Sequence, residues 1–223
     1  MLDHKVHKII FSSTAAVYGN PVKIPIGENC LAAPLNPYGR SKSFVEHILK
    51  DTAKATPLEY IIFRYFNACG NHPSGKIGQL NDNTAHLIFK IFQVVNGQCP
   101  ILPIYGNNYP TPDGTCIRDY IHVMDICQAH LLALRALHSG TKNEVINLGL
   151  GKGFSVKEMI RMTENVCGQH IPSKIFNRRQ GDPAVSIASR SKAKQLLGWK
   201  PTYDLASIIK TTQAWENTRS RLR

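Results

Sequence analysis

The sequence predicts an α/β fold with parallel strands, and three observations support that prediction. Residues 8–13 and 58–63 are short apolar runs, typical of strands that are buried on both faces. Residues 37–55, which separate them, have the spacing of an amphipathic helix. A strand, a helix and a second strand form a βαβ unit, whose strands run parallel. Residues 67–114 are instead rich in turn clusters, which is typical of a ligand-facing lobe.

The other expected elements follow in order along the chain. Ser155 can cap the amino end of a helix, because its hydroxyl precedes an amphipathic run. The sequence shows no internal repeat. The expected elements are a helix over 84–95, a helix over 121–138 after a short strand, a strand over 145–148, and helices over 155–167, 191–197 and 205–219.

The composition is that of an ordinary globular protein. The 223 residues include 43% hydrophobic residues, enough for one domain plus a lobe or two small domains, which excludes a wholly disordered, collagen-like or coiled-coil chain. No apolar run reaches the roughly 18–20 residues of a membrane span, and no signal peptide precedes the first strand, so we expect a cytoplasmic protein. The net charge of +12 comes from singly spread basic residues, which favours a solvated basic surface over nucleic-acid binding.

Neither the cysteines nor the glycines form a recognisable cofactor motif. No C-x-x-C pair is present, so we expect no metal site and interpret the cysteines as small buried apolar residues. Gly149, Gly151 and Gly153 superficially resemble a dinucleotide-binding turn, but Phe154 follows them and no acidic residue lies near position 169. We therefore expect no cofactor turn there, and a P-loop is also absent from the sequence.

Tyr38 and Lys42 are the first candidates for chemistry. They stand four residues apart at the start of a predicted helix, so both side chains project from one face. A tyrosine that acts as a base needs its phenolate stabilised, and a nearby ammonium does so. The hydroxyls of Ser12, Ser13 and Thr14 end the first strand, where open α/β sheets bind ligands. This setting favours a catalytic pair over two unrelated surface side chains.

Several stretches together carry a resemblance to a known family. They are residues 11–19, 37–42, 64–67, 106–123, 147–149 and 178–182. They resemble the UDP-glucose 4-epimerases, which belong to the extended short-chain dehydrogenases/reductases. The likeness covers essentially the whole chain. The block over 113–123 is specific to these epimerases and their nearest relatives, whereas Tyr-x-x-x-Lys alone marks only the superfamily.

The resemblance implies a fold and a division of the chain. The fold would be a partial Rossmann-type parallel sheet, with the last strands only, and a smaller α/β substrate-binding lobe. Residues 1–66 would be the remaining part of the NAD-binding domain and residues 67–223 the UDP-sugar-binding lobe. Strand 144–149 would return to the Rossmann-type sheet.

The resemblance also implies a reaction and the residues that perform it. NAD would take a hydride from sugar C4 while Tyr38 takes the 4-hydroxyl proton, and the 4-keto sugar would turn before the hydride returns, interconverting UDP-glucose and UDP-galactose. Lys42 would bind the nicotinamide ribose and stabilise the Tyr38 phenolate, and Thr14 would hydrogen-bond the sugar 4-oxygen. The cofactor-binding residues would be Ser12, Ser13, Tyr38, Lys42, Tyr65 and Phe66.

The UDP-sugar would contact a second set of residues. Arg118 and Arg179 would bind the diphosphate, the alternative being ordinary surface ion pairs. Ser186 is small at a position that controls access of N-acetylated sugars in this family, so we expect those sugars to fit. The substrate-binding residues would be Thr14, Asn67, His86, Leu87, Leu102, Tyr105, Arg118, Arg179, Asp182 and Ser186.

The chain departs from the family at its amino end. The first strand, its glycine-rich turn and the acidic ribose ligand are missing, which suggests a truncation, a split gene or a misassigned start. We therefore expect the strand around residues 9–11 to be an open sheet edge and the chain alone to have little or no activity. The expected partners are a second copy or a complementing amino-terminal fragment.

Three other functions stay open. The first is another nucleotide-sugar epimerase, or a dehydratase or decarboxylase, although these usually carry an acidic residue near the hydroxyl cluster. The second is a non-catalytic UDP-sugar-binding remnant, and the third a basic RNA-binding fragment.

Overall fold

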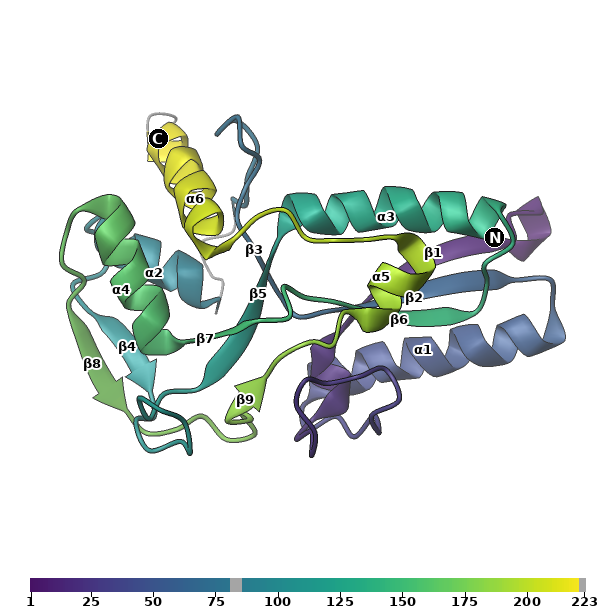
Figure 1. Ribbon diagram of the computed structural model, residues 1–223, viewed down its shortest axis with the longest axis horizontal. Helices are drawn as coiled ribbons and strands as arrows, with labels where there is room; N and C mark the ends of the chain where they lie inside the picture. The colour runs from purple at the N-terminus through teal and green to yellow at the C-terminus, as the bar shows by residue number, and fades with distance from the viewer. Residues whose placement is uncertain (81–85, 221–223) are drawn as a thin grey trace.

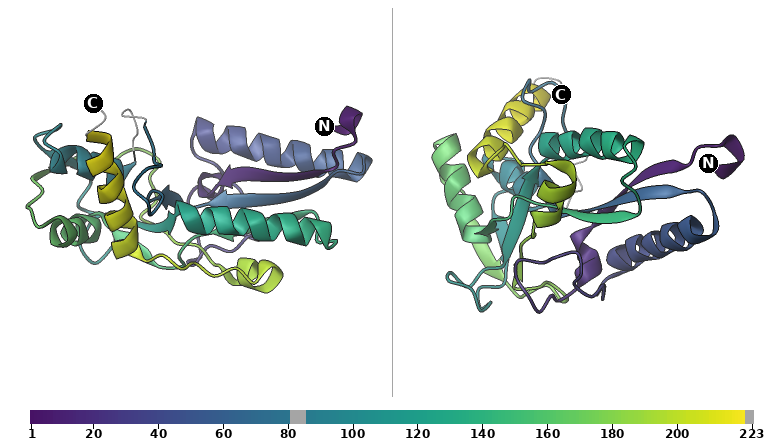
Figure 2. Two further views of the ribbon diagram at one scale, coloured as in Figure 1. Left: turned by 90° about the horizontal axis from the view of Figure 1, so that it is seen from above. Right: turned by 45° about the vertical axis from the view of Figure 1, so that its right-hand side comes forward.

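The computed structural model describes residues 1–80 and 86–220, and it has two parts that lie side by side (Figure 1). In the first part, a parallel sheet has the strand order β1 (Lys8–Thr14), β2 (Glu59–Tyr65), β6 (Glu144–Leu148). The helices α1 (Pro37–Ala55) and α3 (Val123–His138) cover opposite faces of this sheet (Figure 2). The predicted α/β fold with parallel strands is confirmed.

The central strand β2 explains why both faces are covered. Its side chains alternate between the two faces, and five consecutive residues of the strand are buried. Ile62 packs with Leu49 of α1, whereas Ile61 and Phe63 pack with Ala129 and other apolar residues of α3. Within the described residues, β1 pairs with β2 alone, so it forms one edge of the sheet, as expected.

Helix α1 begins where the sequence places a strong start signal. Asn36 is its N-cap, and the Asn36 side-chain oxygen accepts a hydrogen bond from the backbone N–H of Gly39 at 2.8 Å. Pro37 occupies the first turn, where a missing N–H costs nothing. This cap fixes the amino end of α1 beside the carboxyl ends of the strands, which is where Tyr38 lies.

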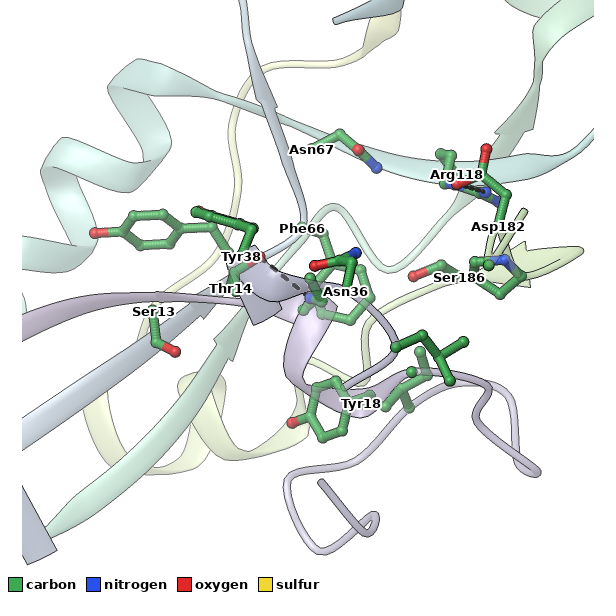
Figure 3. A pocket seen from close by; sticks show the side chains of 18 of the residues that line it. Ser13, Thr14, Tyr18, Asn36, Tyr38, Phe66, Asn67, Arg118, Asp182 and Ser186 are labelled. Carbon is green, nitrogen blue, oxygen red and sulfur yellow. Dashed lines mark hydrogen bonds and ion pairs between the residues drawn. The ribbon is translucent and has the colours of Figure 1, made fainter. Parts of the chain in front are cut away.

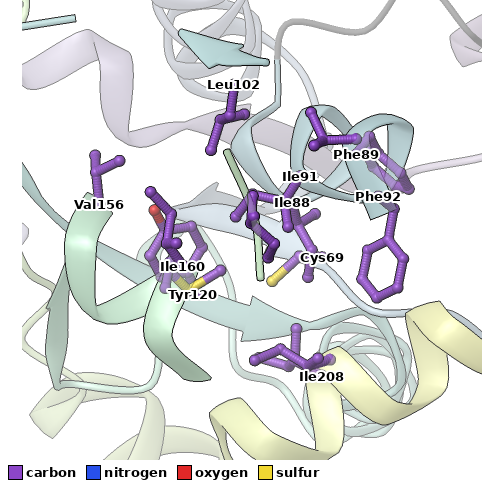
Figure 4. Close-up of a cluster of buried hydrophobic side chains, with 14 of the residues drawn as sticks. Cys69, Ile88, Phe89, Ile91, Phe92, Leu102, Tyr120, Val156, Ile160 and Ile208 are labelled. Carbon is purple, nitrogen blue, oxygen red and sulfur yellow. The ribbon is translucent and has the colours of Figure 1, made fainter. Parts of the chain in front are cut away.

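The second part is the loop-rich lobe, and its strands are short. Its main core joins buried side chains from α2, α4 and α6 with strand residues such as Leu102 and Tyr120 (Figure 4). Strand β5 pairs with β3, β7 and β9, and β4 pairs with β8. The elements of the lobe are β3 (Asn67–Cys69), α2 (Leu87–Val95), β4 (Leu102–Tyr105), β5 (Ile117–His122), β7 (Gly153–Ser155), α4 (Val156–Cys167), β8 (Ser173–Phe176), β9 (Val185–Ser186) and α6 (Leu205–Ser220).

Several boundaries differ from the expected ones. Residues 121 and 122 end strand β5 instead of beginning a helix, because the His122 side chain caps α3 from the position before it. The first two residues of the helix expected over 84–95 lie outside the described residues. Ser155 does cap α4, through a reciprocal capping box with Glu158. The remaining elements are η1 (Leu2–His4), η2 (Ala15–Tyr18) and α5 (Ser191–Leu197).

Two sequence interpretations concern the surface of the fold. The interpretation of all cysteines as buried is wrong for Cys127, which is exposed on α3, and complete burial holds for Cys69. Among the described helices, none combines the length and apolarity needed to cross a membrane.

Candidate active site

Two adjoining cavities lie where the sheet meets the lobe. The first, of about 370 Å³, opens at the carboxyl ends of β1 and β2, and the second, of about 500 Å³, extends into the lobe. Thr14, Tyr38 and Phe66 lie on one side of the first cavity, across from Arg118 and the lobe (Figure 3). The residues that line both cavities are Tyr38, Asn67, Ala68, His86, Arg118 and Asp182.

Tyr38 and Lys42 lie together at the amino end of α1. Tyr38 is 56% exposed, and its hydroxyl has no hydrogen-bond partner among the described residues, so the oxygen is open to a ligand. The Lys42 ammonium lies 6.0 Å from the centre of the Tyr38 ring and 5.1 Å from that of Phe11. It donates a hydrogen bond to the Ser12 carbonyl oxygen at 3.0 Å. A fixed positive charge therefore stands beside an accessible phenol.

Thr14 presents a hydroxyl to the first cavity. The Thr14 side-chain oxygen accepts a hydrogen bond from the backbone N–H of Ala16 at 3.1 Å and so caps the short helix η2. This contact uses a lone pair of the oxygen, and the hydroxyl hydrogen stays free to donate to a ligand in the cavity.

Tyr65 belongs to a chain of hydrogen bonds on the face of the sheet that α3 covers. His130 Nδ1 lies 2.9 Å from the Ile126 carbonyl oxygen, so this nitrogen carries the proton and donates it. His130 Nε2 must then accept from the Tyr65 hydroxyl at 2.9 Å, and the Tyr65 oxygen accepts from the Ser12 hydroxyl at 2.8 Å. Burial raises the pKa of Tyr65, which keeps the phenol protonated as a donor.

Arginines supply positive charge on the lobe side of the cavities. Arg118 lies in both cavities, with its Nη2 3.7 Å from Asp182 Oδ1. Arg179 lines the second cavity, and its guanidinium lies over the ring of Tyr105 at 3.9 Å from the ring centre. Guanidinium groups held in this way suit phosphate or carboxylate oxygens. Burial lowers the pKa of His86, so this side chain is neutral at pH 7.

The glycine turn after β6 is occupied by a carboxylate of the chain itself. Asp119 accepts hydrogen bonds from the backbone N–H groups of Leu150 at 2.6 Å, Gly151 at 2.9 Å and Ala188 at 3.0 Å. Because these donors are used internally, the turn has no free N–H nest for a phosphate. This agrees with the expectation that Gly149, Gly151 and Gly153 are not a cofactor turn.

Three predicted site residues line neither cavity. Ser12 contacts the lining residue Tyr65 through its hydroxyl, and Lys42 donates to the Ser12 carbonyl oxygen and lies 6.0 Å from the ring centre of the lining residue Tyr38. Leu102 is 1% exposed and belongs to the apolar core of the lobe. The other predicted site residues do line a cavity: Ser13, Thr14, Tyr38, Tyr65, Phe66, Asn67, His86, Leu87, Tyr105, Arg118, Arg179, Asp182 and Ser186.

Other lining residues were not predicted from the sequence. Asn36 could have been found, since an asparagine before a proline at a helix start is a strong N-cap signal. Tyr18 enters the first cavity from η2, and burial raises its pKa to about 12 while its hydroxyl donates to Asn147 Oδ1 at 2.7 Å. Lys90 and Cys116 line the second cavity, and no local pattern marks them.

Comparisons with known proteins show which family the chain belongs to. Residues 1–149 match the model of the NAD dependent epimerase/dehydratase family. The chain is 48% identical over 216 residues to a UDP-glucose 4-epimerase of Halalkalibacterium halodurans, a match that covers 96% of this chain and 65% of the relative.

Solved structures give the same result. A UDP-glucose 4-epimerase of Stenotrophomonas maltophila, with bound NAD and formylated UDP-arabinopyranose, has a TM-score of 0.97 and 41% identity, over all of this chain and 67% of that one. The UDP-Glc/GlcNAc 4-epimerase of Campylobacter jejuni has a TM-score of 0.81 and 42% identity, over 97% of this chain and 66% of that one. This chain thus spans about two thirds of the length of the relatives it matches.

Proposed function

Because this chain belongs to the NAD dependent epimerase/dehydratase family, we propose that it is the catalytic and sugar-nucleotide-binding part of a UDP-glucose 4-epimerase. The observation that carries the proposal is the accessible Tyr38 phenol beside the fixed Lys42 ammonium, at the cavity that also holds Thr14. Relatives that are named UDP-glucose 4-epimerases cover nearly the whole chain, which supports this reaction over that of a dehydratase.

Tyr38 acts as the base in the proposed mechanism. Its oxygen accepts the proton of the sugar 4-hydroxyl, and the Lys42 ammonium stabilises the negative charge that the phenolic oxygen carries before the transfer. Thr14 donates its hydroxyl hydrogen to the sugar 4-oxygen and so orients it toward Tyr38. When bound, NAD would take up the hydride from sugar C4 and return it to the other face of the ketone.

The described residues fit one end of NAD. The nicotinamide ribose would lie at the carboxyl ends of β1 and β2, held by Lys42, with Ser12, Ser13, Tyr65 and Phe66 around it. For the adenosine and pyrophosphate end, the described ranges offer no strand followed by a free glycine-rich turn, since Asp119 occupies the turn after β6. The proposal therefore places the nicotinamide end on this chain and the other end on a further segment.

The UDP group would occupy the second cavity. Arg118 and Arg179 both reach it and would contact the diphosphate, while Asn67, His86, Leu87 and Tyr105 would line the uridine side. The neutral His86 adds no charge that would have to be desolvated when the uracil binds. Leu102 lies beneath this wall in the core and would act by packing.

Ser186 supports a broader substrate range. It pairs with Arg118 across β5 and β9 and lines the first cavity, where its small side chain leaves space. We therefore propose that UDP-N-acetylhexosamines are accepted as well. Failure of an active preparation to turn over UDP-GlcNAc would contradict this part of the proposal.

The proposal includes partners and a location. A second copy of the chain or a complementing amino-terminal segment would complete the enzyme, and the cytoplasm would be its site of action. The first sheet edge, β1, would carry the pairing with such a segment, since its outer backbone groups have no strand partner among the described residues.

A complementation assay tests the proposal. The chain is assayed for conversion of UDP-galactose to UDP-glucose with NAD, alone and mixed with the amino-terminal third of the Halalkalibacterium halodurans relative. We expect activity in the mixture that Tyr38→Phe lowers by at least about 10³-fold, of the order general-base catalysis supplies. Tyr203→Phe, which removes a hydroxyl outside both cavities, is the matched control. UDP binding without turnover in the mixture would instead identify a non-catalytic binding protein.

A further inference from the structure

A row of buried polar side chains crosses the sheet directly beneath the candidate site. Ser13 of β1 is the register partner of Arg64 of β2, and Arg64 is that of Asn147 of β6. These three residues are 2%, 4% and 0% exposed. The next residue along each of the first two strands is Thr14 and Tyr65, which line the first cavity. The row thus borders the site, and Ser13 at its β1 end also lines the first cavity.

Glu46 of α1 joins this row to the helix that carries Tyr38. The Glu46 carboxylate is 1% exposed and accepts a hydrogen bond from the Ser13 hydroxyl at 2.5 Å. Arg64 contacts both carboxylate oxygens, with Nε 3.0 Å from Oε1 and Nη2 2.6 Å from Oε2. Burial alone would raise the pKa of Glu46, but the Arg64 and Ser13 hydrogen bonds outweigh it and the pKa lies below its ordinary value. The carboxylate is therefore charged at neutral pH.

The Arg64 guanidinium is held on its other side by an aromatic ring. It lies 4.7 Å from the centre of the Tyr18 ring, and Tyr18 in turn donates to Asn147. A cation over a ring face is attracted to it, which helps to compensate the guanidinium for its burial. Asn147 also donates its side-chain N–H to the Ile26 carbonyl oxygen, at 2.9 Å. The network thereby reaches the wall of the first cavity, which Tyr18 and Ile26 form in part.

A buried ion pair of this kind is weak evidence for a role in stability. Apolar residues of similar volume at such positions often give equal or greater stability, because two charges must lose their water. The bidentate contact between Arg64 and Glu46, called the fork below, does fix the orientation of the two side chains, since it forms in one geometry only. Among the described residues, the side-chain hydrogen bonds from α1 to the strands come from Glu46 and Lys42 alone.

We propose that Ser13, Glu46 and Arg64 form a positioning triad that fixes the rotation and register of α1 on the sheet. Glu46 lies four residues after Lys42, on the same face of α1, so the fork on Glu46 holds Lys42 against the Ser12 carbonyl oxygen. Tyr38 lies one further turn toward the amino end. The triad would thus set where the phenol and the ammonium stand, and two of its members, Glu46 and Arg64, line neither cavity. The catalytic part of this inference rests on the proposed epimerase function.

The decisive variant replaces both charges with apolar side chains. Glu46→Met/Arg64→Met keeps the volume and removes the fork, so we expect unfolding at an unchanged or higher temperature. The matched control is Lys8→Met/Glu59→Met, which removes an ion pair at 2.5 Å between register partners at the other end of β1 and β2. Both variants therefore lose one charge of each sign, and each loses one of its two charges from β2.

The primary measurement needs no catalytic activity. The full chain is exposed briefly to acetic anhydride, and acetylation of Lys42 is quantified by peptide mass spectrometry, with exposed Lys54 of the same helix as the internal reference. We expect Lys42 to be acetylated severalfold faster in Glu46→Met/Arg64→Met and at an unchanged rate in the control. An unchanged Lys42 rate in a folded Glu46→Met/Arg64→Met chain would overturn the proposal.

Two further measurements complete the test. If the double variant does not fold, Ser13→Ala is used for the acetylation measurement instead, because it removes one contact of Glu46 and leaves the ion pair. Unchanged acetylation of Lys42 in Ser13→Ala would then overturn the proposal. In the complementation assay, Glu46→Met/Arg64→Met should lower kcat about 100-fold with little change in KM, as expected for misplacement of about 1 Å. Absence of any turnover in the unsubstituted mixture would contradict the proposed function, whereas the acetylation result stands independently of it.

Discussion

Acidification should destabilise the chain through His122, the residue that joins β5 to α3. The His122 ring is fully buried, its Nδ1 accepts from the backbone N–H of Met124 at 3.1 Å, and its Nε2 lies 2.9 Å from Thr211 Oγ1. The ring also stacks on Tyr203, with 4.0 Å between the ring centres. Only the neutral ring can accept at Nδ1, so protonation removes the cap of α3. Burial lowers the pKa of His122 to about 4, although Asp125 opposes the shift.

The sign and size of the effect follow from linkage. The unfolded chain binds a proton at His122 near pH 6.5 and the folded chain near pH 4, so stability is full above pH 6.5 and falls as the pH falls toward 4. The difference of about 2.5 pH units, at about 1.4 kcal/mol each, corresponds to about 3.5 kcal/mol. Asp119 acts in the opposite direction over an overlapping range, because burial raises its pKa to about 6.

A variant isolates the contribution of His122 from that of Asp119. In His122→Asn the amide oxygen can still cap α3, but no group titrates at this position. Urea unfolding, followed by the fluorescence of Trp199 and Trp215, is measured for the unsubstituted chain and for His122→Asn at pH 7.5 and at pH 4.5. At each pH it gives the difference in unfolding free energy between the two chains. That difference should shrink by about 2–3 kcal/mol at the lower pH. His138→Asn, which removes an exposed histidine from the other end of α3, is the control. A difference that does not change with pH would refute the reasoning.

Three further predictions test how the site is supported. Ser155→Ala removes the capping box of α4 and should cost about 1–2 kcal/mol in urea unfolding, whereas a loss below about 0.3 kcal/mol would show that the box contributes nothing. Gly39→Ala places a Cβ 2.6 Å from the Ala16 carbonyl oxygen, so it should lower the stability by about 1–3 kcal/mol although alanine favours helices; thermal unfolding at or above the original temperature would contradict this. Leu102→Ala should lower the unfolding free energy by about 2–5 kcal/mol while the affinity for UDP, measured by calorimetry, stays the same. A weakened affinity in the folded variant would show that Leu102 contributes to UDP binding.

The parts predicted best from the sequence are those with long local signals. The apolar run of β2 is buried on both faces, and α1 has both an N-cap and a proline in its first turn. The expectation of burial on both faces is wrong for β1, whose apolar residues are only partly buried because β1 is the edge strand. Strands β4, β7 and β9 were not predicted, since elements of two to four residues contain too few positions to show alternation. Their pairing depends on neighbours that are distant in the sequence, so only the folded chain shows it.

The residues of the candidate site likewise fall into those that the sequence predicts and those that it does not. Tyr38 and Lys42 could be predicted because one helical turn brings them together, and the structure places their side chains near each other. His130 and Glu46 could not, because their partners come from strand register. His130 meets Tyr65, and Glu46 meets Arg64, only after β1, β2 and the two helices have assembled. A local pattern therefore finds residues that meet within one element, and it misses those that meet between elements.

The hydroxyl cluster at the end of β1 shows how strand geometry assigns different tasks to similar neighbours. Successive strand side chains point to opposite faces, so Ser12 faces α3 and donates to Tyr65, while Ser13 faces α1 and donates to Glu46. Thr14 ends the strand, caps η2 and presents its hydroxyl to the first cavity. The three hydroxyls thus serve two supporting networks and one ligand-facing position. Since both networks converge on residues 64 and 65 of β2, the placement of the site depends on the β1–β2 register as much as on Tyr38 itself.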